Sequence, residues 1–336
     1  MRRFCFVLGA LLLSTSLSNG QVASSPPAVP LEPIAAILDA FKTHQIVALG
    51  EGPHGNEQGH AFRLSLIRDP RFPTLVNDIL VESGNARHQD VIDRYVNGEA
   101  VSRETLRRVW EDTTVPSTVW DRPIYEEFYR TVREVNATLA PARKLRVLLG
   151  DPPIDWSVVR TPDEVLGWQK QRDSYPADVL QREVVAKKRR ALLIYGDGHL
   201  VRAQTGTVVN LVEAGGAPRM FTIMTDPPVD LANLQADVAT WRKPSIALVR
   251  DTVMGTKELS FYFGPFTQRT DDQFDAFLYL GPSSDITMAP LAPALCMDAG
   301  YMEMRIRRFA LTPGQAAQSG ANRLQQYCAS VTAKAK

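Results

Sequence analysis

The sequence is poor in three features that would place it in a specialised class of protein. Only three cysteines occur among 336 residues, which excludes a small module built around disulfides. Neither sign of charge is in excess, because 38 basic residues face 37 acidic ones. This balance, with 44% hydrophobic and 22% charged residues, excludes a disordered chain and predicts no nucleic-acid partner. The length allows one large domain or two ordinary ones.

Long apolar runs are also scarce, and the clearest one lies at the N-terminus. Two arginines at positions 2 and 3 precede an apolar run over 4–13, and small polar residues follow it. This order is typical of a secretory signal peptide, and the run is too short to span a bilayer. We therefore expect residues 1–20 to be removed before Gln21. The mature chain should be periplasmic or secreted, with no membrane span.

Two cysteines remain after the predicted cleavage, because Cys5 lies within the signal peptide. An oxidising compartment favours a disulfide between Cys296 and Cys328. Two cysteines carry little pattern information, so two buried free thiols stay open as the alternative.

The arrangement of apolar and amphipathic stretches predicts the fold class. Short aliphatic and β-branched runs alternate with longer amphipathic stretches, and the runs lack the polar alternation of half-exposed strands. This pattern predicts a three-layer α/β/α domain with a mainly parallel central sheet of about seven strands. The expected strands are 45–50, 74–81, 145–150, 191–195, 220–225, 245–250 and 274–280. The expected helices are 31–43, 57–68, 86–95, 103–110, 123–139, 161–171 and 177–188.

The predicted boundaries give one domain after a short linker. A segment rich in proline and serine covers 21–35, and the α/β domain is expected over 36–336. Residues 102–136 interrupt the alternation of strands with two helical stretches, which we interpret as a helical flap over the sheet. Residues 282–336 form a C-terminal segment.

Polar side chains follow almost every expected strand. In open parallel sheets the ligand crevice lies at the carboxyl ends of the strands, so these side chains should converge there. The alternative that the acids are helix caps or turn residues stays open, above all for the two at 226 and 251. Histidine and glutamate are not preferred caps, and the cap interpretation explains them less well. The residues concerned are Glu51, His54, Glu82, Asp151, Asp197, His199, Asp226 and Asp251.

The segment 50–55 has the sequence GEGPHG, which formally matches the glycine-rich turn of dinucleotide-binding proteins. We reject that interpretation because Glu51 would place a carboxylate beside the pyrophosphate. In addition, Pro53 removes one backbone N–H from the anion-binding turn. The sequence contains no phosphate-binding loop, no G-x-S-x-G elbow, no H-E-x-x-H and no C-x-x-C.

Several segments, taken in order, resemble the erythromycin esterase-like family. That family belongs to a wider superfamily with the ChaN haem-binding proteins and the Tiki and TraB proteases. The resemblance covers roughly 36–200, with weaker agreement to about 281. The segments are IVALGEGPHG (46–55), Arg63, LVES around Glu82, HQDVIDRYVNG (88–98), the pair Trp110 and Trp120, FYRTVREVN (128–136), LLGD (148–151) and LIYGDGHL (193–200).

The resemblance implies roles for individual residues. It makes His54 the general base that activates a hydrolytic water, with Glu51 and Glu82 orienting it. It further places Arg63 where it serves the site electrostatically, His199 where it closes the site from the fourth strand, and Asp151 at an acidic position at a strand end.

One position departs from the family pattern. Esterase members usually have a His-Asn-x-His type of segment, and Gly196 stands where the first histidine would be. This departure puts macrolide hydrolysis in doubt. The remaining G-x-x-H form resembles the metal-dependent branch of the superfamily.

The chemistry of these residues supports hydrolysis without reference to the family. An imidazole held by a carboxylate can deprotonate water near neutral pH, and an arginine can stabilise the developing oxyanion. No serine or cysteine stands in a recognisable nucleophile setting. The first hypothesis is therefore an exported hydrolase of an ester or lactone bond in a small-molecule substrate, requiring no cofactor.

Two further hypotheses use the same residues. His54, His199, Glu51 and Glu82 form a reasonable ligand set for a divalent metal such as Zn²⁺ or Mn²⁺ in a metallohydrolase. The third hypothesis is a protein that binds haem, iron or a small ligand without catalysis. If none of the three holds, the remaining alternative is a purely structural role.

Four residues are expected to contact the substrate. They are Asp151 and Asp197 at strand ends, His60 on the helix after the first strand, and Trp120 in the predicted flap. For His60 a role in packing or at the surface stays open.

Overall fold

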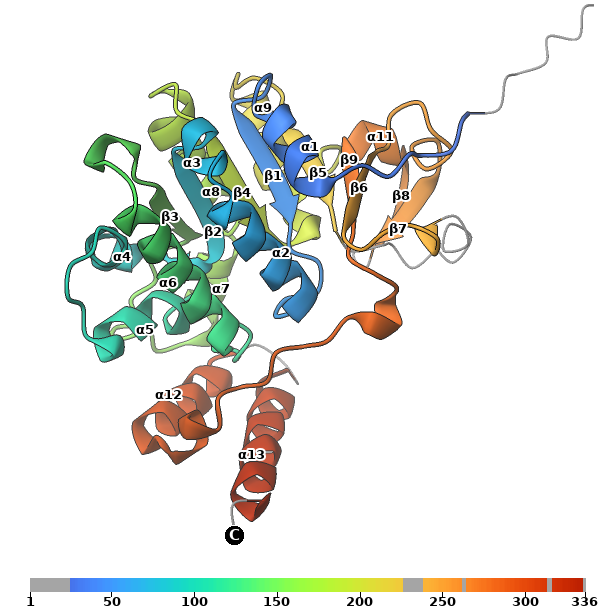
Figure 1. Ribbon diagram of the computed structural model, residues 1–336. Helices are drawn as coiled ribbons and strands as arrows, with labels where there is room; N and C mark the ends of the chain where they lie inside the picture. Colours follow the sequence, from blue (N-terminus) through green and yellow to red (C-terminus); the bar gives the residue numbers. More distant parts are fainter. Residues whose placement is uncertain (1–24, 226–237, 262–263, 313–315, 335–336) are drawn as a thin grey trace, which may run out of the picture.

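The computed structural model describes residues 25–225, 238–261, 264–312 and 316–334. The predicted signal peptide and Asp226 lie outside these ranges. Seven strands form one sheet in the order β3-β2-β4-β1-β5-β9-β6 (Figure 1), and every neighbouring pair is parallel except β9 and β6. The predicted mainly parallel α/β fold is thereby confirmed.

The bounds of the elements are as follows. The strands of the sheet are β1 (Ile46–Gly50), β2 (Asp78–Asn85), β3 (Arg146–Asp151), β4 (Ala191–Tyr195), β5 (Phe221–Met224), β6 (Ser245–Leu248) and β9 (Ala276–Tyr279), and a separate hairpin consists of β7 (Glu258–Phe261) and β8 (Gly264–Arg269). The helices are α1 (Pro33–Ala40), α2 (Glu57–Arg68), α3 (Phe72–Leu75), α4 (Gln89–Val96), α5 (Arg103–Glu111), α6 (Pro123–Ala137), α7 (Pro162–Gln169), α8 (Ser174–Val179), α9 (Val208–Ala214), α11 (Thr270–Gln273), α12 (Ala299–Ala310) and α13 (Ala316–Lys334).

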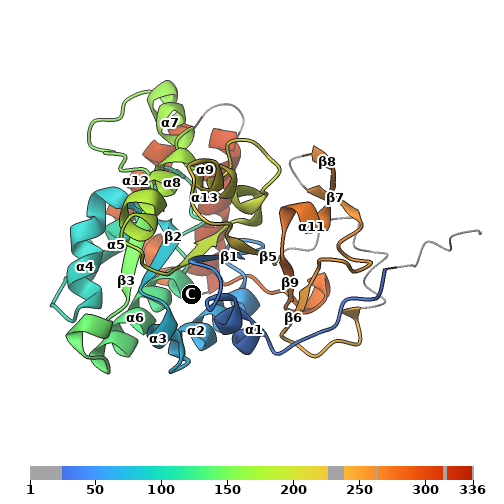
Figure 2. The ribbon, with the colours of Figure 1, turned by 90° about the horizontal axis from the view of Figure 1, so that it is seen from above.

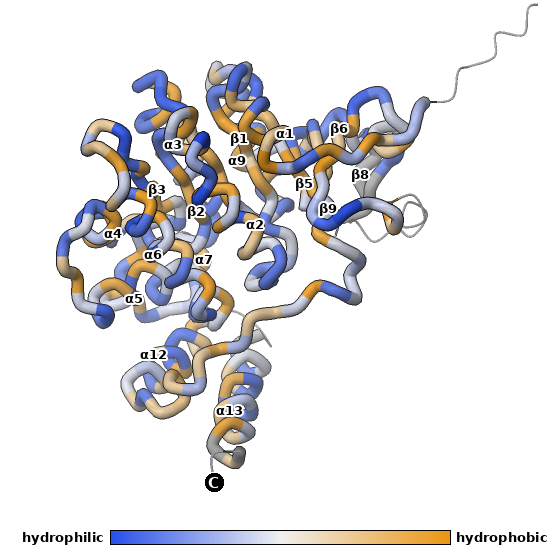
Figure 3. The backbone as a smooth tube through the Cα atoms, viewed as in Figure 1, coloured by the Kyte–Doolittle hydropathy of each residue, from blue (hydrophilic) through white to orange (hydrophobic). Residues whose placement is uncertain are grey.

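Helices cover both faces of the sheet, because alternate strand residues point to opposite faces. In β1, Val47 and Leu49 pack against a core shared with α1 to α6, and Ile46 and Ala48 pack against a second core with α8 and α9. Figure 2 shows the two helix layers from above, and Figure 3 shows hydrophobic residues concentrated along the strands between them. The unbroken apolar runs of the sequence are thus explained by strands that are buried on both faces.

The topology opens a crevice between the ends of β1 and β4. These two strands are neighbours, but the chain leaves β1 for α2 in the first helix layer and leaves β4 for α9 in the second. Loops that diverge from adjacent parallel strands leave a crevice at the carboxyl edge. The residues after β1 and β4 therefore meet there.

The second strand differs from its prediction in a way that matters for the site. It begins at Asp78 rather than at position 74, because α3 occupies the preceding segment, and it continues to Asn85. Its pairing with β3 shifts register between Val81 and Asn85, which marks a bulge. Such bulges turn side chains out of their regular alternation, and Glu82 lies within this one.

Other elements were missed or placed differently by the sequence patterns. The predicted strand 245–250 is an antiparallel edge strand, and Asp251 lies just beyond it in a turn with φ 60°. The β7–β8 hairpin, α9, α12 and α13 were not predicted. In the segment 102–136, predicted as a flap, α5 and α6 belong to the first helix layer, and the loop between them reaches the site.

The C-terminal segment forms two helices that are tied together and docked on that loop. A disulfide joins Cys296, just before α12, to Cys328 in α13. The phenol of Tyr301 and the guanidinium of Arg305, both on α12, bond to the buried Asp121. In the described ranges, no helix combines the length and apolar character needed to cross a membrane.

Reducing the disulfide should destabilise the protein. The bond closes a loop with a sequence separation of 32, for which loss of chain entropy in the unfolded state contributes about 3–4 kcal/mol. Denaturant unfolding should show a loss of that size when reductant is added to the wild type. The double variant Cys296→Ser/Cys328→Ser should show the same loss and no response to reductant. Equal stability of the oxidised and reduced wild type would contradict this expectation.

Candidate functional site

The loop after β1 is held in a fixed shape by Asn56. This residue is fully buried and caps α2, since its Oδ1 accepts from the N–H of Gly59 at 2.6 Å. Its Nδ2 donates to the carbonyl oxygens of Glu51 at 2.9 Å and Pro53 at 2.7 Å. The short segment that carries Glu51 and His54 is therefore pinned to the start of a helix.

The glycines of this loop serve the turn. Gly52 and Gly55 adopt φ values of 68° and 84°, a region that favours glycine. Asp197 accepts the N–H of Gly52 at 2.8 Å and that of Thr225 at 2.7 Å, so it joins the ends of β1, β4 and β5. A side chain at Gly50 would collide with this carboxylate. The glycine pattern is thus explained without a dinucleotide.

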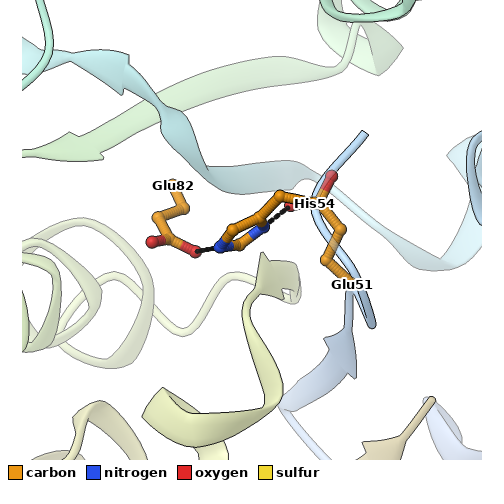
Figure 4. A group of neighbouring side chains, drawn as sticks. All are labelled: Glu51, His54 and Glu82. Carbon is orange, nitrogen blue, oxygen red and sulfur yellow. Dashed lines mark hydrogen bonds and ion pairs between the residues drawn. The ribbon is translucent and has the colours of Figure 1, made fainter. Parts of the chain in front are cut away.

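His54 lies between two buried glutamates. Its Nδ1 is 2.8 Å from Glu51 Oε2, and its Nε2 is 3.9 Å from Glu82 Oε2 (Figure 4). Both glutamates are 3% exposed, whereas the His54 side chain is 30% exposed. The Trp120 ring packs against the imidazole with centroids 4.6 Å apart. One nitrogen of His54 is therefore fixed by a carboxylate, and the other faces a second carboxylate beyond hydrogen-bond distance.

Arg63 lies behind Glu51 and holds its carboxylate. Its Nη2 donates to Glu51 Oε1 at 3.2 Å, and the phenol of Tyr125 donates to the same oxygen at 3.0 Å. Burial would raise the pKa of Glu51, but the charge of Arg63 and the hydrogen bond with His54 lower it. Because Arg63 is only 3% exposed, it positions Glu51 and is badly placed to meet a substrate oxyanion.

Glu82 is held by a different arginine, which sequence reasoning did not identify. Arg172 bonds to Glu82 Oε1, and the N–H of Gly196 donates to Oε2 at 2.8 Å. His199 Nε2 lies 3.5 Å from Oε1. Burial would raise the pKa of Glu82, but the positive charges of His54, His199 and Arg172 lower it to about 2.

Gly196 allows His54 and Glu82 to approach this closely. A Cβ at this position would lie 3.1 Å from His54 Cε1 and 3.4 Å from Glu82 Oε2. The first contact is tighter than ordinary van der Waals packing permits. A side chain at position 196 would therefore force His54 to move.

His199 is oriented from the opposite side by Asp173. Its Nδ1 is 2.8 Å from Asp173 Oδ1, which also accepts the N–H of Val208 at 3.0 Å. Asp173 was likewise missed, because an acid next to an arginine at the end of a predicted helix carries no signal of a site. The pair Asp173 and His199 thus forms a second carboxylate–imidazole arrangement beside Glu82.

The charges around His54 keep it protonated near neutral pH. Burial would lower its pKa, but the charge of Glu82 and the hydrogen bond and charge of Glu51 raise the pKa of His54 to about 9. The ordinary value is about 6.5. At rest, an imidazolium therefore neutralises part of the charge of two buried carboxylates.

All four predicted substrate contacts are engaged with the protein. Asp197 accepts the two backbone N–H groups described above and also lines the pocket in front of His54, and its role in substrate binding stays a prediction. Asp151 accepts the N–H and the hydroxyl of Thr114 at 2.7 and 2.6 Å, and burial raises its pKa to about 7. His60 is 6% exposed and bonds to Glu127 at 3.1 Å. Trp120, 1% exposed, lies against His54. A role for Asp151, His60 or Trp120 in substrate binding stays a prediction.

A pocket of about 650 Å³ opens in front of His54 and His199. The lining is mostly glycine, hydroxyl, amide and charged groups, with Pro53 as its apolar member. The lining residues are Gly52, Pro53, His54, Arg172, Asp173, Gly196, Asp197, Gly198, His199, Gln204, Thr205, Gly206 and Thr207.

Glu51, His54 and Glu82 are also candidate ligands of a metal ion. Glu51, His54 and Glu82 each offer one ligand atom, and these atoms lie within 4.8 Å of one another. However, the carboxylate of Glu51 is already paired with Arg63 and that of Glu82 with Arg172. A divalent cation would add to two guanidinium groups there, so the charges fit a proton on His54 better than a metal ion.

The comparisons with known proteins agree with the fold and go no further. No protein-family model matches the sequence, and neither does any characterised protein. A solved Bacillus cereus protein superposes with a TM-score of 0.56 at 11% identity, covering 79% of this chain and 97% of its own. A succinoglycan biosynthesis protein gives 0.56 at 11%, covering 76% and 94%. Such likenesses show the fold alone, so the resemblance to the erythromycin esterase-like family stays a prediction.

ChaN of Campylobacter jejuni, described as binding haem cofacially, also aligns. Its TM-score is 0.39 at 14% identity, and the alignment covers 57% of this chain and 85% of that protein. A likeness this weak carries no argument about the ligand.

His54 and His60 should have pKa values that are shifted in opposite directions, above 6.5 for His54 and below 6.5 for His60. NMR titration should find a pKa of about 9 for His54 and a value below 6.5 for His60, whose burial and proximity to Arg63 lower its pKa. Glu82→Gln should lower the pKa of His54, because the largest attraction that raises it is lost. Glu127→Gln is the matched control and should change only His60.

The same pKa predicts how stability depends on pH. Because the folded pKa of His54 lies above its unfolded value, its protonation stabilises the fold fully below about pH 6.5, and this contribution disappears as the pH rises through about 9. A pKa near 6.5 for His54 in the folded protein would contradict both expectations.

Proposed function

We propose that the protein is an exported hydrolase of an ester or lactone bond, acting by direct attack of water with His54 as general base. The observation that carries this proposal is the setting of His54. Its Nδ1 is fixed by Glu51, its Nε2 faces Glu82, and its side chain is 30% exposed and lines the pocket. A water molecule that hydrogen-bonds to both Nε2 and Glu82 Oε2 fits their separation of 3.9 Å.

The reaction would follow from this arrangement. Water attacks the carbonyl carbon as its proton passes to Nε2 of neutral His54, and the C=O electron pair moves to the carbonyl oxygen. The tetrahedral oxyanion then collapses, the bond to the leaving oxygen breaks, and His54 returns the proton to that oxygen. Glu51 stabilises the imidazolium between these steps, since it already bonds to Nδ1.

Arg172 is the arginine that supports the charged intermediate in this proposal. It lines the pocket and its side chain is 25% exposed, whereas Arg63 is buried behind Glu51. A positive charge near the developing oxyanion lowers the barrier most when it is fixed in advance. The bond to Glu82 fixes Arg172 in this way.

A metal-dependent hydrolase is the second candidate, because Glu51, His54 and Glu82 offer converging ligand atoms. The two guanidinium groups argue against it, as described above. Haem binding has less support, because a protonated His54 cannot act as an axial ligand.

Export is supported by one feature besides the N-terminal sequence. The disulfide between Cys296 and Cys328 is typical of an oxidising compartment.

His54→Ala should abolish ester hydrolysis. Residues 21–336 should be assayed on simple esters and macrolactones, with and without exhaustive chelation. We expect the wild type to hydrolyse at least one compound and His54→Ala to lose at least about 100-fold in kcat/KM. His44→Gln, outside the site, should match the wild type. Survival of activity after chelation supports the water mechanism, and its loss supports the metal-dependent candidate. Hydrolysis of no compound would contradict the proposal.

The pH profile should show that the base must lose its proton. Because only neutral imidazole accepts a proton, kcat/KM should rise about tenfold per pH unit and level off near pH 9, the pKa of His54 in the free protein. Glu82→Gln should move this rise to lower pH. A wild-type profile that is flat above pH 6.5 would exclude His54 as a base of this pKa.

A further inference from the structure

A second pocket shares Pro53 with the pocket that contains His54. Its volume is about 220 Å³, and it lies at the ends of β5 and β9. The lining residues are Pro53, Asn56, Thr225, Phe277, Tyr279, Leu280, Gly281, Ser283, Ile286 and Met288. We call it the apolar pocket, and we call the pocket in front of His54 the polar pocket.

The chain after β9 forms the outer wall of the apolar pocket and is fastened to the loop that carries His54. The N–H of Glu57 donates to the carbonyl of Thr287, and that of Ala289 donates to the carbonyl of Gly55, each at 2.9 Å. In Figure 1 this orange segment leaves the end of β9 and continues toward α12. The wall of the apolar pocket is therefore hydrogen-bonded to the residues that follow His54.

The two pockets differ in chemistry. The apolar pocket is lined mainly by aromatic and aliphatic side chains, among them Phe277, Leu280 and Ile286. The polar pocket presents hydroxyl, amide and charged groups, among them Arg172 and Thr207. A dry apolar cavity of about 150 Å³ is enough to hold a benzene ring. The apolar pocket therefore has room for a short hydrocarbon chain.

Pro53 lines both pockets and immediately precedes His54 in the chain. The two pockets therefore adjoin the same loop, and the residue they share is next to His54 in the chain. An ester has two parts, an acyl chain and an alcohol. When the alcohol carries several hydroxyl groups, the acyl chain is apolar and the alcohol is polar.

We propose that the apolar pocket binds the acyl chain of the substrate, and that the substrates are esters of short fatty acids with a polar, hydroxylated alcohol. The proposal rests on the hydrolase function proposed above, because it places the scissile carbonyl at His54. Acyl chains of about four to six carbons fit the pocket, and the alcohol lies against Arg172 and His199 in the polar pocket.

Chain-length selectivity tests this assignment. With p-nitrophenyl acetate, butyrate, hexanoate and decanoate, kcat/KM should rise about fourfold per methylene up to the length that the pocket holds, then fall. Ile286→Trp, at a half-buried wall position, should fill the pocket and lower the ratio of hexanoate to acetate activity about tenfold or more. Ile286→Ala should move the optimum to longer chains. Leu248→Trp, an exposed apolar position on the sheet edge, should leave the profile unchanged.

Binding of the product acid tests the pocket independently of catalysis. Hexanoate should bind the full chain more tightly than acetate in an NMR titration, and Ile286→Trp should remove this preference. Hexanoate binding that depends on Ile286, without hydrolysis of any ester, would overturn the hydrolase and keep the pocket. Hydrolysis with a chain-length profile that neither Ile286 variant changes would overturn the acyl pocket and keep the hydrolase.

Discussion

The site depends on the neutralisation of two buried carboxylates. Glu51 and Glu82 are both 3% exposed, and a buried charge is costly unless it is paired and hydrogen-bonded. Each has its own guanidinium, Arg63 from α2 and Arg172 from the chain after α7, and they share the imidazole of His54. These requirements draw three parts of the chain, around Glu51, Glu82 and Arg172, to one edge of the sheet. The high pKa of His54 is a consequence of the same arrangement.

The sheet topology provides the crevice in which the segments after β1 and β4 come into close contact. A crevice opens between β1 and β4 because the chain leaves these neighbours for opposite helix layers. Within it, Gly196 lets the end of β4 approach His54, and its N–H bonds to Glu82. Asp197 next to it bonds to the backbone after β1 and β5. The segment after β4 therefore supports the site mainly through the N–H of Gly196 and the space that this glycine leaves for His54. Its histidine, His199, lines the pocket.

Sequence patterns predicted the parts of the fold that depend on buried strands. β1 and β4 are continuous apolar runs, β3 contains a shorter one over 147–149, and the polar residues after β1 and β4 do converge. The patterns did not predict side chains that reach the site from segments distant in the sequence. Arg172 and Asp173 stand at a helix end, where charged residues are usually solvated, and only the fold shows that they face Glu82 and His199. Arg63 was expected to serve the site electrostatically, and helical spacing alone does not show that its partner is Glu51.

The C-terminal helices extend the site's supports to the end of the chain. Trp120 packs on His54, and the next residue, Asp121, is bonded by Tyr301 and Arg305 of α12. A fully buried ion pair such as Asp121–Arg305 adds little net stability, but it admits few alternative arrangements of the segments it joins. Because Trp120 is the immediate neighbour of Asp121, this pair fixes the ring that covers His54. The disulfide holds α13 against the start of α12, so the last helices of the chain support the geometry of the loop that carries Glu51 and His54.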